Sequence, residues 1–302
     1  MSNRAFIYIS IMLVSFLAAV VMMTPREVTT IYLPTENMED ATSLLPSDKE
    51  VASKAIERMN SRNDQVKTLS FSDIDIRLIQ GGKSVKLSGF MVFERNRKFR
   101  MVQNSILGKE VDIGSDEDRF WFWSKRMKPP SLYYAPHEKA HTTGLRAPFD
   151  PSWITEILGM KDIDPNAEII EHQDKWFVIE DRVGTNGKPI SKVTLINKSK
   201  EYAIGHYMFD QTGKILISAE IKSFHTMGQS VVPREMDIIW FSEGVQVNWK
   251  MHNMKHNVPI DASNWRMPSI RDRINLEDRV PTYQAFSPKP VGAYARSLSV
   301  PW

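Results

Sequence analysis

Two pairs of histidines have the four-residue spacing found in many metal sites. His137 and His141 lie in a turn-rich segment, and His252 and His256 lie where a strand runs into a loop. Four-residue spacing places two imidazole rings on one side of a helix, but not in a strand or a turn. We therefore expect ordinary polar side chains at both pairs and no metal site.

Other catalytic and ligand-binding patterns are incomplete. The segment Gly82-Lys83-Ser84 ends like a phosphate-binding loop, but Arg77 stands where the first glycine would be, and the segment joins two strands. The acidic turn at residues 116–118 has too few alternating oxygen ligands for calcium. The sequence lacks both a Gly-x-Ser-x-Gly nucleophile elbow and any cysteine, which excludes thiol catalysis and disulfides. We expect a protein that is not an enzyme and uses no cofactor.

The chemistry that the sequence does offer is apolar binding, centred on Phe120-Trp121-Phe122-Trp123. Successive side chains of a strand point to opposite faces, so this stretch places two large rings on each face. A strand with one face in water would carry polar residues at every second position. The stretch is therefore either a core strand covered on both faces by the protein itself, or one that turns a face to an apolar guest.

The rest of the chain must position this strand, and its pattern predicts one helix followed by a large sheet. A capping box at residues 47–50 precedes apolar residues at helical spacing as far as Met59. From Leu69 onward the period is two, with glycine-containing turns between short strands. A second helix is expected after Asp150-Pro151. The expected fold class is mainly β with a few helices, built on one large antiparallel sheet that is curled or nearly closed.

The first residues bear on the compartment. Arg4 precedes an apolar run that reaches Met23 and is broken only by Ser10 and Ser15. At roughly 19 residues this run can span a bilayer as a helix, and it lacks small residues before a plausible cleavage point. We expect residues 1–24 to be an uncleaved signal anchor in the membrane, with the body on the periplasmic side of the cell envelope. The alternative is a cleaved signal peptide and a soluble periplasmic protein.

The remaining chain is expected in three parts. Residues 25–46 contain three prolines and no sustained period, as in a linker. Residues 47–268 form the folded domain, and residues 269–302 form an extended or disordered tail. The net charge is only +3, with lysine and arginine scattered among acidic residues, so we expect no nucleic acid partner.

The expected segments follow one another in a recognisable order. They are an early helix, a strand and its continuation at residues 89–100, an acidic turn at 112–119, the aromatic strand at 120–123, a tyrosine-containing strand, a proline-initiated helix, a hairpin at 207–213 and the segment 232–235. This order resembles the LolA/LolB superfamily of periplasmic lipoprotein carriers and its membrane-anchored relatives. The resemblance covers residues 47–268. It implies an unclosed antiparallel barrel whose helices cover an apolar cavity on the open side.

The resemblance also implies a role for Arg95. In LolA an arginine at this position, followed by proline, helps to hold the helical lid and couples its opening to cargo. Here Asn96 replaces the proline and Glu94 stands beside Arg95. The residues by themselves indicate an exposed arginine at a strand end, paired with a neighbouring carboxylate.

These observations predict a non-enzymatic envelope protein that binds acyl chains of lipoproteins or free lipid, as a carrier or chaperone. The partners would be the acyl chains, the membrane through the N-terminal segment, and an envelope protein that the sequence does not name. The alternative is an envelope sensor or scaffold that uses the same fold without cargo. A carrier needs an accessible apolar tunnel, whereas a scaffold can be filled by its own side chains.

The expected cavity wall consists of residues with no polar alternative on their strand. They are Met91, Phe93, Met101, Phe120, Trp121, Phe122, Trp123, Leu132 and Tyr134, with Trp153 and Ile157 on the covering helix. Only one of the two ring pairs in the aromatic strand can face the cavity, and we favour the tryptophans.

Overall fold

A large curled sheet dominates the computed structural model, which describes residues 42–43, 46–95, 97–127, 129–143, 151–184, 188–241 and 243–277. Its fifteen strands lie in the order β1-β8-β9-β10-β11-β12-β13-β14-β2-β3-β4-β5-β6-β7-β15. All neighbouring pairs are antiparallel except β7 and β15. The edge strands β1 and β15 do not pair with each other, so the sheet is not closed. The expected fold class is confirmed.

The elements follow one another in chain order with short connections between most of the strands. They are β1 (Thr42–Ser43), α2 (Pro46–Asn63), β2 (Thr68–Gln80), β3 (Lys83–Glu94), β4 (Lys98–Ser105), β5 (Gly108–Ser115), β6 (Arg119–Ser124), β7 (Leu132–Pro136), the 3₁₀ helix η2 (His137–Thr142), α3 (Pro151–Ile157), β8 (Glu168–His172), β9 (Lys175–Val183), β10 (Pro189–Asn197), β11 (Tyr202–Asp210), β12 (Ile215–Met227), β13 (Ser230–Trp240), β14 (Val245–His256), the 3₁₀ helix η3 (Ala262–Trp265) and β15 (Arg273–Asn275).

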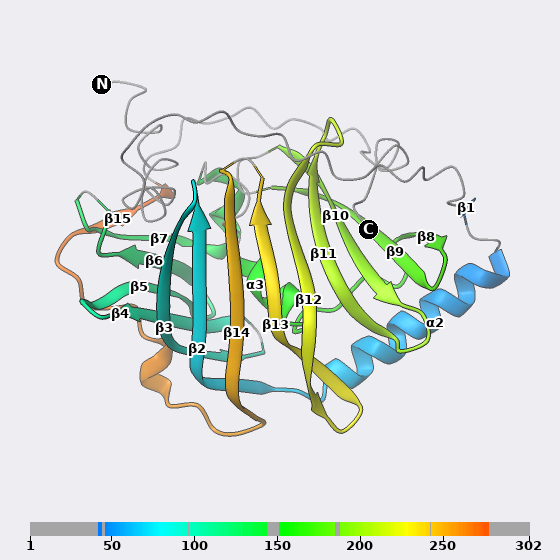
Figure 1. Cartoon of the computed structure of the whole chain (residues 1–302), viewed down its shortest axis with the longest axis horizontal. Coiled ribbons are helices and arrows are strands. Elements are labelled where there is room, and N and C mark those ends of the chain that lie inside the picture. The colour runs from blue at the N-terminus through cyan, green and yellow to red at the C-terminus, as the bar shows by residue number, and fades with distance from the viewer. Residues whose placement is uncertain are drawn as a thin grey trace.

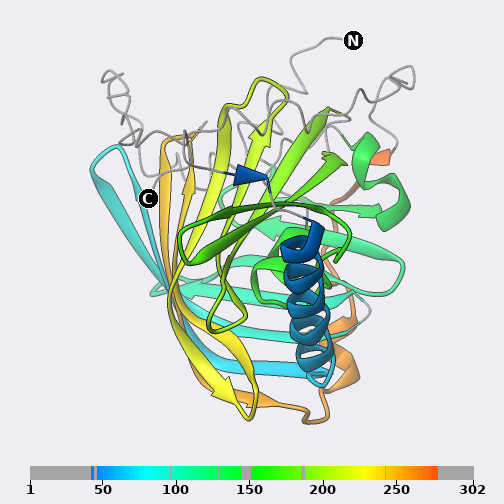
Figure 2. The same ribbon diagram turned by 90° about the vertical axis from the view of Figure 1, so that its right-hand side faces the viewer.

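The sheet curls around the two α-helices, which lie on its concave side (Figures 1 and 2). Helix α2 buries Ala52, Ala55, Ile56 and Met59, which recur at helical spacing and form one face. This face packs on apolar residues of β8, β9 and β10, among them Trp176. The predicted first helix is therefore present, and its apolar stripe faces the sheet.

The main core occupies the concave face beside α3. The register shows how this face continues across the sheet: Phe71 pairs with Met91, Met91 with Met101, and Met101 with Ile113. Trp153 and Ile157 of α3 belong to the same apolar cluster. Each large side chain buried in this way contributes about 1.5–3 kcal/mol to folding. Helix α3 is too short to be stable alone, so this packing is what holds it.

The convex face is covered in part by the chain that follows β14. Arg100 of β4 donates to the carbonyl oxygens of Ser263 and Asn264, next to η3. Beyond η3, β15 pairs with β7 at the edge of the sheet, and Leu276 is buried in one cluster with Phe120 and Phe122 of β6. Residues 273–277 therefore belong to the folded body, although the domain was expected to end at residue 268. The apolar alternation that anchors them, Ile274 and Leu276, is too brief to stand out in the sequence.

In the part of the chain that the structure describes, no helix is long and apolar enough to cross a membrane. The expected anchor, residues 1–24, and the tail beyond residue 277 lie outside the described residues.

Candidate functional site

The aromatic strand β6 places its phenylalanines on the concave face. Phe122 pairs with Ile113 of β5 and stacks on Tyr133 of β7, with ring centroids 5.2 Å apart. Ile113 packs against both the main concave cluster and the cluster of Phe120 and Phe122, which makes the two clusters neighbours on one face. The phenylalanines thus extend the concave core.

The tryptophans of the same strand point the other way. A Cβ atom on Gly114 would lie 2.4 Å from the Trp121 ring, so Trp121 lies over Gly114 on the convex face. Trp123 shares that face by alternation, and its indole nitrogen donates to the Pro130 carbonyl at 3.1 Å. The expectation that the tryptophans face the cavity is therefore wrong. Alternation separates the two pairs, but only the neighbouring strands decide which pair lies inside.

The other expected wall residues divide in the same manner. Met91, Phe93, Met101, Trp153 and Ile157 lie together in the concave cluster. Leu132 and Tyr134 alternate with Tyr133 and lie on the convex face, where Tyr134 pairs with Trp121. The structure therefore brings seven of the eleven expected residues to one side of the sheet, with the two phenylalanines of β6 among them.

The concave face is filled by the protein's own side chains in the described part of the chain. Met91 and Ile157 are fully buried, and Trp153 is 2% exposed. Helix α3 supplies the side chains that a guest would have to replace. The indole nitrogens of Trp153 and Trp249, which also belong to this cluster, are buried without a hydrogen-bond partner among the described residues. The concave face is thus closed, yet it retains polar groups that a guest's oxygen could satisfy.

A small pocket lies where α2, α3 and the strands β10–β13 meet. Its cavity volume is about 30 Å³, which has room for a few water molecules. Apolar and polar side chains both line it: Met59, Asn63, Glu156, Ile157, Leu158, Gly159, Lys161, Ile163, Lys192, Tyr202, Ala203, His206, Ile221, Phe224, Val231 and Pro233.

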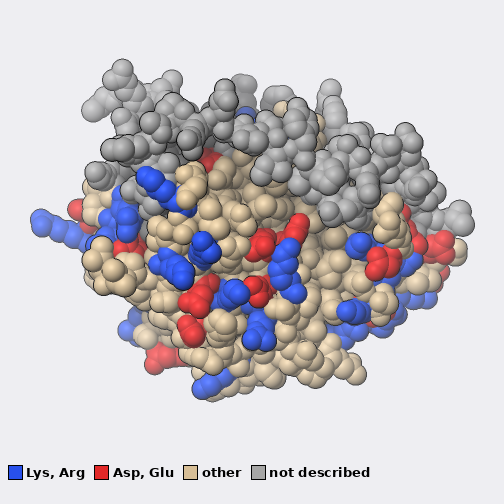
Figure 3. All heavy atoms as spheres, in the orientation of Figure 1, with Lys and Arg blue, Asp and Glu red and all other residues tan. Residues whose placement is uncertain are grey.

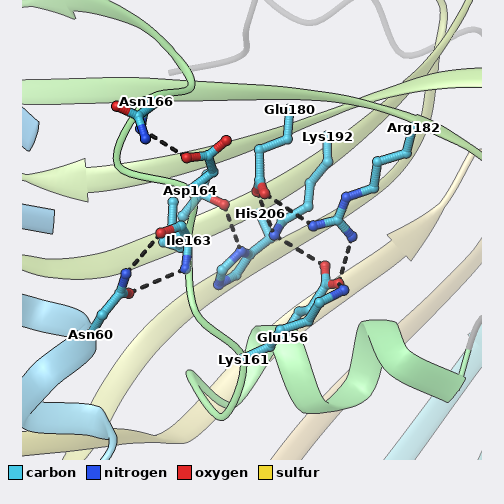
Figure 4. Close-up of polar contacts among 11 residues, drawn as sticks. Asn60, Glu156, Lys161, Ile163, Asp164, Asn166, Glu180, Arg182, Lys192 and His206 are labelled. Atoms are coloured by element: carbon cyan, nitrogen blue, oxygen red, sulfur yellow. Dashed lines mark hydrogen bonds and ion pairs between the residues drawn. The ribbon is translucent and has the colours of Figure 1, made fainter. Parts of the chain in front are cut away.

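A buried ion-pair cluster ties α3 to the sheet beside this pocket (Figure 4). The carboxylate of Glu156 lies 2.5 Å from Arg182 Nη1, 2.6 Å from Lys161 Nζ and 3.0 Å from Lys192 Nζ. Lys192 and Arg182 also pair with Glu180, at 2.9 and 3.2 Å. Glu156 and Lys192 are almost completely buried. Every charge in this cluster has a partner of opposite sign, which is the condition for keeping such groups inside a protein.

The protonation states of the cluster follow from its surroundings. Burial alone would raise the pKa of Glu156, but the cations Lys192, Arg182 and Lys161 lower it to about 2. Burial, reinforced by the Lys192 charge, lowers the pKa of His206 to about 3. At neutral pH the carboxylate is therefore ionised and the imidazole is neutral.

Sequence reasoning missed this cluster. Lys192 lies in β10, a strand that also carries Ile190, Val193, Leu195 and Ile196, and Glu156 lies on the apolar side of α3 next to Ile157. A buried ion pair could have been suspected from a lysine inside an apolar strand and a glutamate on the buried face of a helix. Sequence spacing alone could not pair the two, because they lie 36 positions apart.

Arg95 connects the end of β3 with the end of α2 and the segment after α3. It lies just after β3, and its Nη1 is 2.8 Å from Asp64 at the end of α2 and 3.7 Å from Asp162 after α3. Its Nε donates to the Val66 carbonyl at 2.9 Å. Arg95 is largely buried, in contrast to the exposed strand-end arginine that the residues alone indicate.

Two of the four candidate histidines have structural partners. His137 Nε2 lies 2.9 Å from the Asp116 carbonyl, and His252 lies 3.7 Å from Asp75. Within the described ranges no group of three or more metal-ligating side chains is present. Basic and acidic side chains are interspersed on the face of the molecule that Figure 3 shows, so this face offers no continuous basic surface.

Comparison with known proteins gives a likeness of fold. No family model matches the chain, and no curated protein matches it. A DUF1329 family protein from Desulfovibrio piger matches with a TM-score of 0.50 and 11% identity, covering 72% of this chain and 96% of that one. An outer membrane lipoprotein-sorting protein domain from Vibrio parahaemolyticus and a LolA superfamily protein from Nitrosomonas europaea match with TM-scores of 0.46 and 0.47, at 9% and 8% identity. Each covers 72% of this chain and 97% of its own.

The expected architecture is confirmed. The sheet is unclosed, its helices lie in the concavity, and the fold matches that of the D. piger protein. At these identities the likeness concerns architecture alone, and the function must be argued from the site.

Proposed function

We propose that this chain is a non-enzymatic protein of the cell envelope that binds acyl chains of lipoproteins or lipids on the concave face of its sheet, as a carrier or chaperone. The observation that carries the proposal is the arrangement of α3. Its Trp153 and Ile157 occupy an apolar face of aromatic and methionine side chains, while its Glu156 joins it to the sheet by ion pairs. The helix is thus a separable cover over an apolar surface.

The exchange of side chains for a guest is energetically reasonable. An acyl chain of about sixteen carbons contributes roughly 12 kcal/mol on full burial, at 0.8 kcal/mol per methylene. Displacing two or three large side chains of the cover costs about 1.5–3 kcal/mol each. The methionines of the face, such as Met91, Met101, Met236 and Met251, suit a variable guest because thioether side chains are flexible.

Arg95 fits the lid-coupling role that the resemblance implies. It joins the end of α2 to the segment after α3 through Asp64 and Asp162. Opening α3 must break the contact with Asp162 and the hydrogen bond to the Met160 carbonyl, which is 3.3 Å long. Arg95 therefore links movement of one helix to the other, despite the missing proline.

The hairpin between β4 and β5 offers a point of contact with a membrane. Ile106 at its tip is fully exposed and Leu107 is 68% exposed. Lys125 donates to the Leu107 carbonyl at 2.8 Å, so a cation lies beside the apolar tip. Apolar side chains next to cations suit the boundary between acyl chains and acidic head groups. Such a contact fits a protein that exchanges acyl chains with a bilayer, with the N-terminal segment as its anchor.

The proposal is tested by quenching of tryptophan fluorescence with a brominated fatty acid. Saturable quenching is expected, and Trp153→Phe should remove a large part of it because Trp153 lies on the concave face. Trp121→Phe, on the convex face, is the matched control and should leave the quenching unchanged. If Trp121→Phe abolishes the saturable quenching and Trp153→Phe retains it, the guest lies elsewhere and the proposal is overturned.

A second candidate function is an envelope sensor or scaffold. The observation in its favour is that the concave face is already filled by the protein's own side chains in the described residues. Such a protein would need no opening of α3. Absence of any saturable quenching would favour this function over the carrier.

A further inference from the structure

His206 is buried with one ring nitrogen unused. It lies on β11 at 2% exposure, and its Nδ1 is 3.4 Å from the hydroxyl of Thr194 on β10. Its Nε2 is buried and has no hydrogen-bond partner among the described residues. The ring lines the pocket between α2, α3 and the sheet, beside the loop that carries Ile163 (Figure 4). A buried polar group without a hydrogen-bond partner destabilises a fold, so this nitrogen calls for a partner inside the pocket.

A second polar group of this pocket comes from α2. Asn63 lines the same pocket, and its side-chain amide makes no hydrogen bond within the described part of the chain. It lies near the turn at Gly159, whose added Cβ would be 3.4 Å from Asn63 Nδ2. If the Thr194 hydroxyl donates to His206 Nδ1, then Nε2 carries the proton. His206 on β11 and Asn63 on α2 can then each donate an N–H to a ligand held in this pocket.

The charges around the pocket favour an acceptor that is an anion. Three cations, Lys161, Lys192 and Arg182, surround two carboxylates, Glu156 and Glu180. The cluster is therefore left with one positive charge in excess in a largely buried place. Lys161, which also lines the pocket, is 45% exposed. One negative charge on the ligand would balance the excess positive charge of the cluster. The attraction between the two charges is stronger here than in water, because little solvent screens it.

The size and the walls of the pocket limit the ligand further. A cavity of about 30 Å³ accepts a small head group and not a chain. The walls beside the polar groups are apolar and include Ile163, Ile221, Phe224 and Val231. Small ligand sites of this kind combine an apolar lining with a few convergent polar groups.

We propose that this pocket is a carboxylate subsite that takes the head group of a fatty acid, while the alkyl chain lies outside the pocket on the apolar concave face of the sheet. His206 Nε2–H and the Asn63 amide donate to the carboxylate oxygens, and Lys161 supplies positive charge. The inference rests on the proposed function, because it names a ligand class for the region under the helices. It gives the charged carboxylate of a free fatty acid a binding site, whereas an esterified acyl chain has no such charged group to bind.

The test compares decanoate with 1-decanol, which have the same chain length and differ in charge. The full chain is labelled with ¹⁵N in its histidine rings, and each probe is titrated while the Nε2 resonance of His206 and the dissociation constant are followed. Decanoate should shift the His206 Nε2 resonance with saturation and bind at least about tenfold more tightly than decanol. The decanol titration should leave that resonance unchanged.

Two variants locate the source of the preference. His206→Phe keeps the ring and removes the donor, and the ratio of the decanol to decanoate dissociation constants should fall to about one while decanol affinity stays the same. Asn63 is partly exposed at the end of α2, so its substitution does not disturb the buried cluster. Asn63→Leu should lower that ratio about threefold. His252→Phe on β14, outside the pocket, is the matched control and should preserve the ratio.

The outcomes separate this inference from the proposed function. Equal affinity for decanoate and decanol would overturn the subsite and leave apolar binding intact. Decanoate binding with an unmoved His206 resonance, or a preference retained in both variants, would place the anion elsewhere and likewise overturn it. If neither probe binds and brominated fatty acid gives no quenching, both the subsite and the proposed function fall.

Discussion

Glu156 shows how much a single buried charge can determine. It lies on the sheet side of α3 and meets Arg182, Lys161 and Lys192. Removing one partner of a buried pair leaves the others uncompensated, because the cost of taking them out of water remains. The pairs therefore fix where α3 rests on the sheet, more than they add to net stability.

Glu156→Gln should lower the free energy of unfolding by about 3–5 kcal/mol, since it leaves Lys192 buried with less negative charge nearby. Chemical denaturation monitored by circular dichroism measures the change. Glu171→Gln is the matched control, because Glu171 pairs with Lys198 and both side chains are partly exposed. This substitution should lower the free energy of unfolding by no more than about 1 kcal/mol. Equal effects of the two substitutions would contradict the role given to the buried cluster.

His206 makes the stability of the fold depend on pH. Burial lowers its pKa from 6.5 to about 3, so below pH 6.5 the unfolded chain binds a proton that the folded chain does not. The free energy of unfolding should therefore fall as the pH drops from 6.5 toward 3, by up to about 1.4 kcal/mol per pH unit. The stabilising contribution of ionised Glu156 is present above its usual value of 4.5 and is lost toward its folded pKa of about 2.

The two groups can be separated because their pH ranges overlap only in part. His206→Phe should flatten the dependence of unfolding free energy on pH between 6.5 and 5, where Glu156 is ionised in both states. Urea titrations at several pH values measure the slope. A slope in this range that is as steep in His206→Phe as in the unmodified protein would show that His206 is not buried in its neutral form.

At the scale of elements, the cluster around Glu156 holds the last turn of α3 to the sheet, and Arg95 holds the segment that follows α3. Arg95→Met keeps the apolar stem and removes the contacts to Asp64, Asp162 and the Val66 carbonyl. We expect faster amide hydrogen exchange in α3 and in the segment that follows it, with global stability lowered by only about 1–2 kcal/mol.

The control for Arg95 is Arg100→Met. Arg100 has the same side-chain exposure, 14%, but it pairs with Asp112 on the convex face. Arg100→Met should leave amide hydrogen exchange in α3 unchanged. If Arg100→Met and Arg95→Met have the same effect on α3, then Arg95 does not couple the two helices.

The β4–β5 hairpin tests the proposed contact with a bilayer. Replacement of Ile106 and Leu107 together by aspartate should abolish binding to vesicles that contain anionic lipid, because it removes the apolar tip and adds repulsion. Both side chains are exposed, so thermal stability should be unchanged within about 0.5 kcal/mol. Co-sedimentation with the vesicles measures binding. Undiminished sedimentation would exclude the hairpin as the contact.

Periodicity and turn signals could predict most elements of this fold, because each signal lies within a few neighbouring residues. The helical spacing of apolar residues in α2 and the alternation in β2 and β3 are of this kind. The side of the sheet that each face of β6 occupies could not be predicted, since it depends on β5 and β7. The pairing of Glu156 with Lys192 and the placing of β15 beside β7 depend on contacts between distant segments, which no local pattern encodes.

At the scale of the whole molecule, the unclosed sheet explains why a cover is needed. A closed barrel of fixed size would define its own cavity, whereas the gap between β1 and β15 leaves the concave face dependent on α2 and α3. The helices fill that face with Trp153, Ile157 and the apolar stripe of α2. The structure is therefore the closed state of the proposed carrier, and cargo requires an open one.

The most direct measurement is photo-crosslinking with a fatty acid that carries a diazirine at the end of its chain. After irradiation and digestion, mass spectrometry locates the modified residues. The account predicts crosslinks on the concave face, in peptides that contain Met91, Met101 or Trp153, and competition by unlabelled fatty acid. Crosslinks confined to the convex face around Trp121 and η3, or crosslinks that no fatty acid displaces, would contradict it.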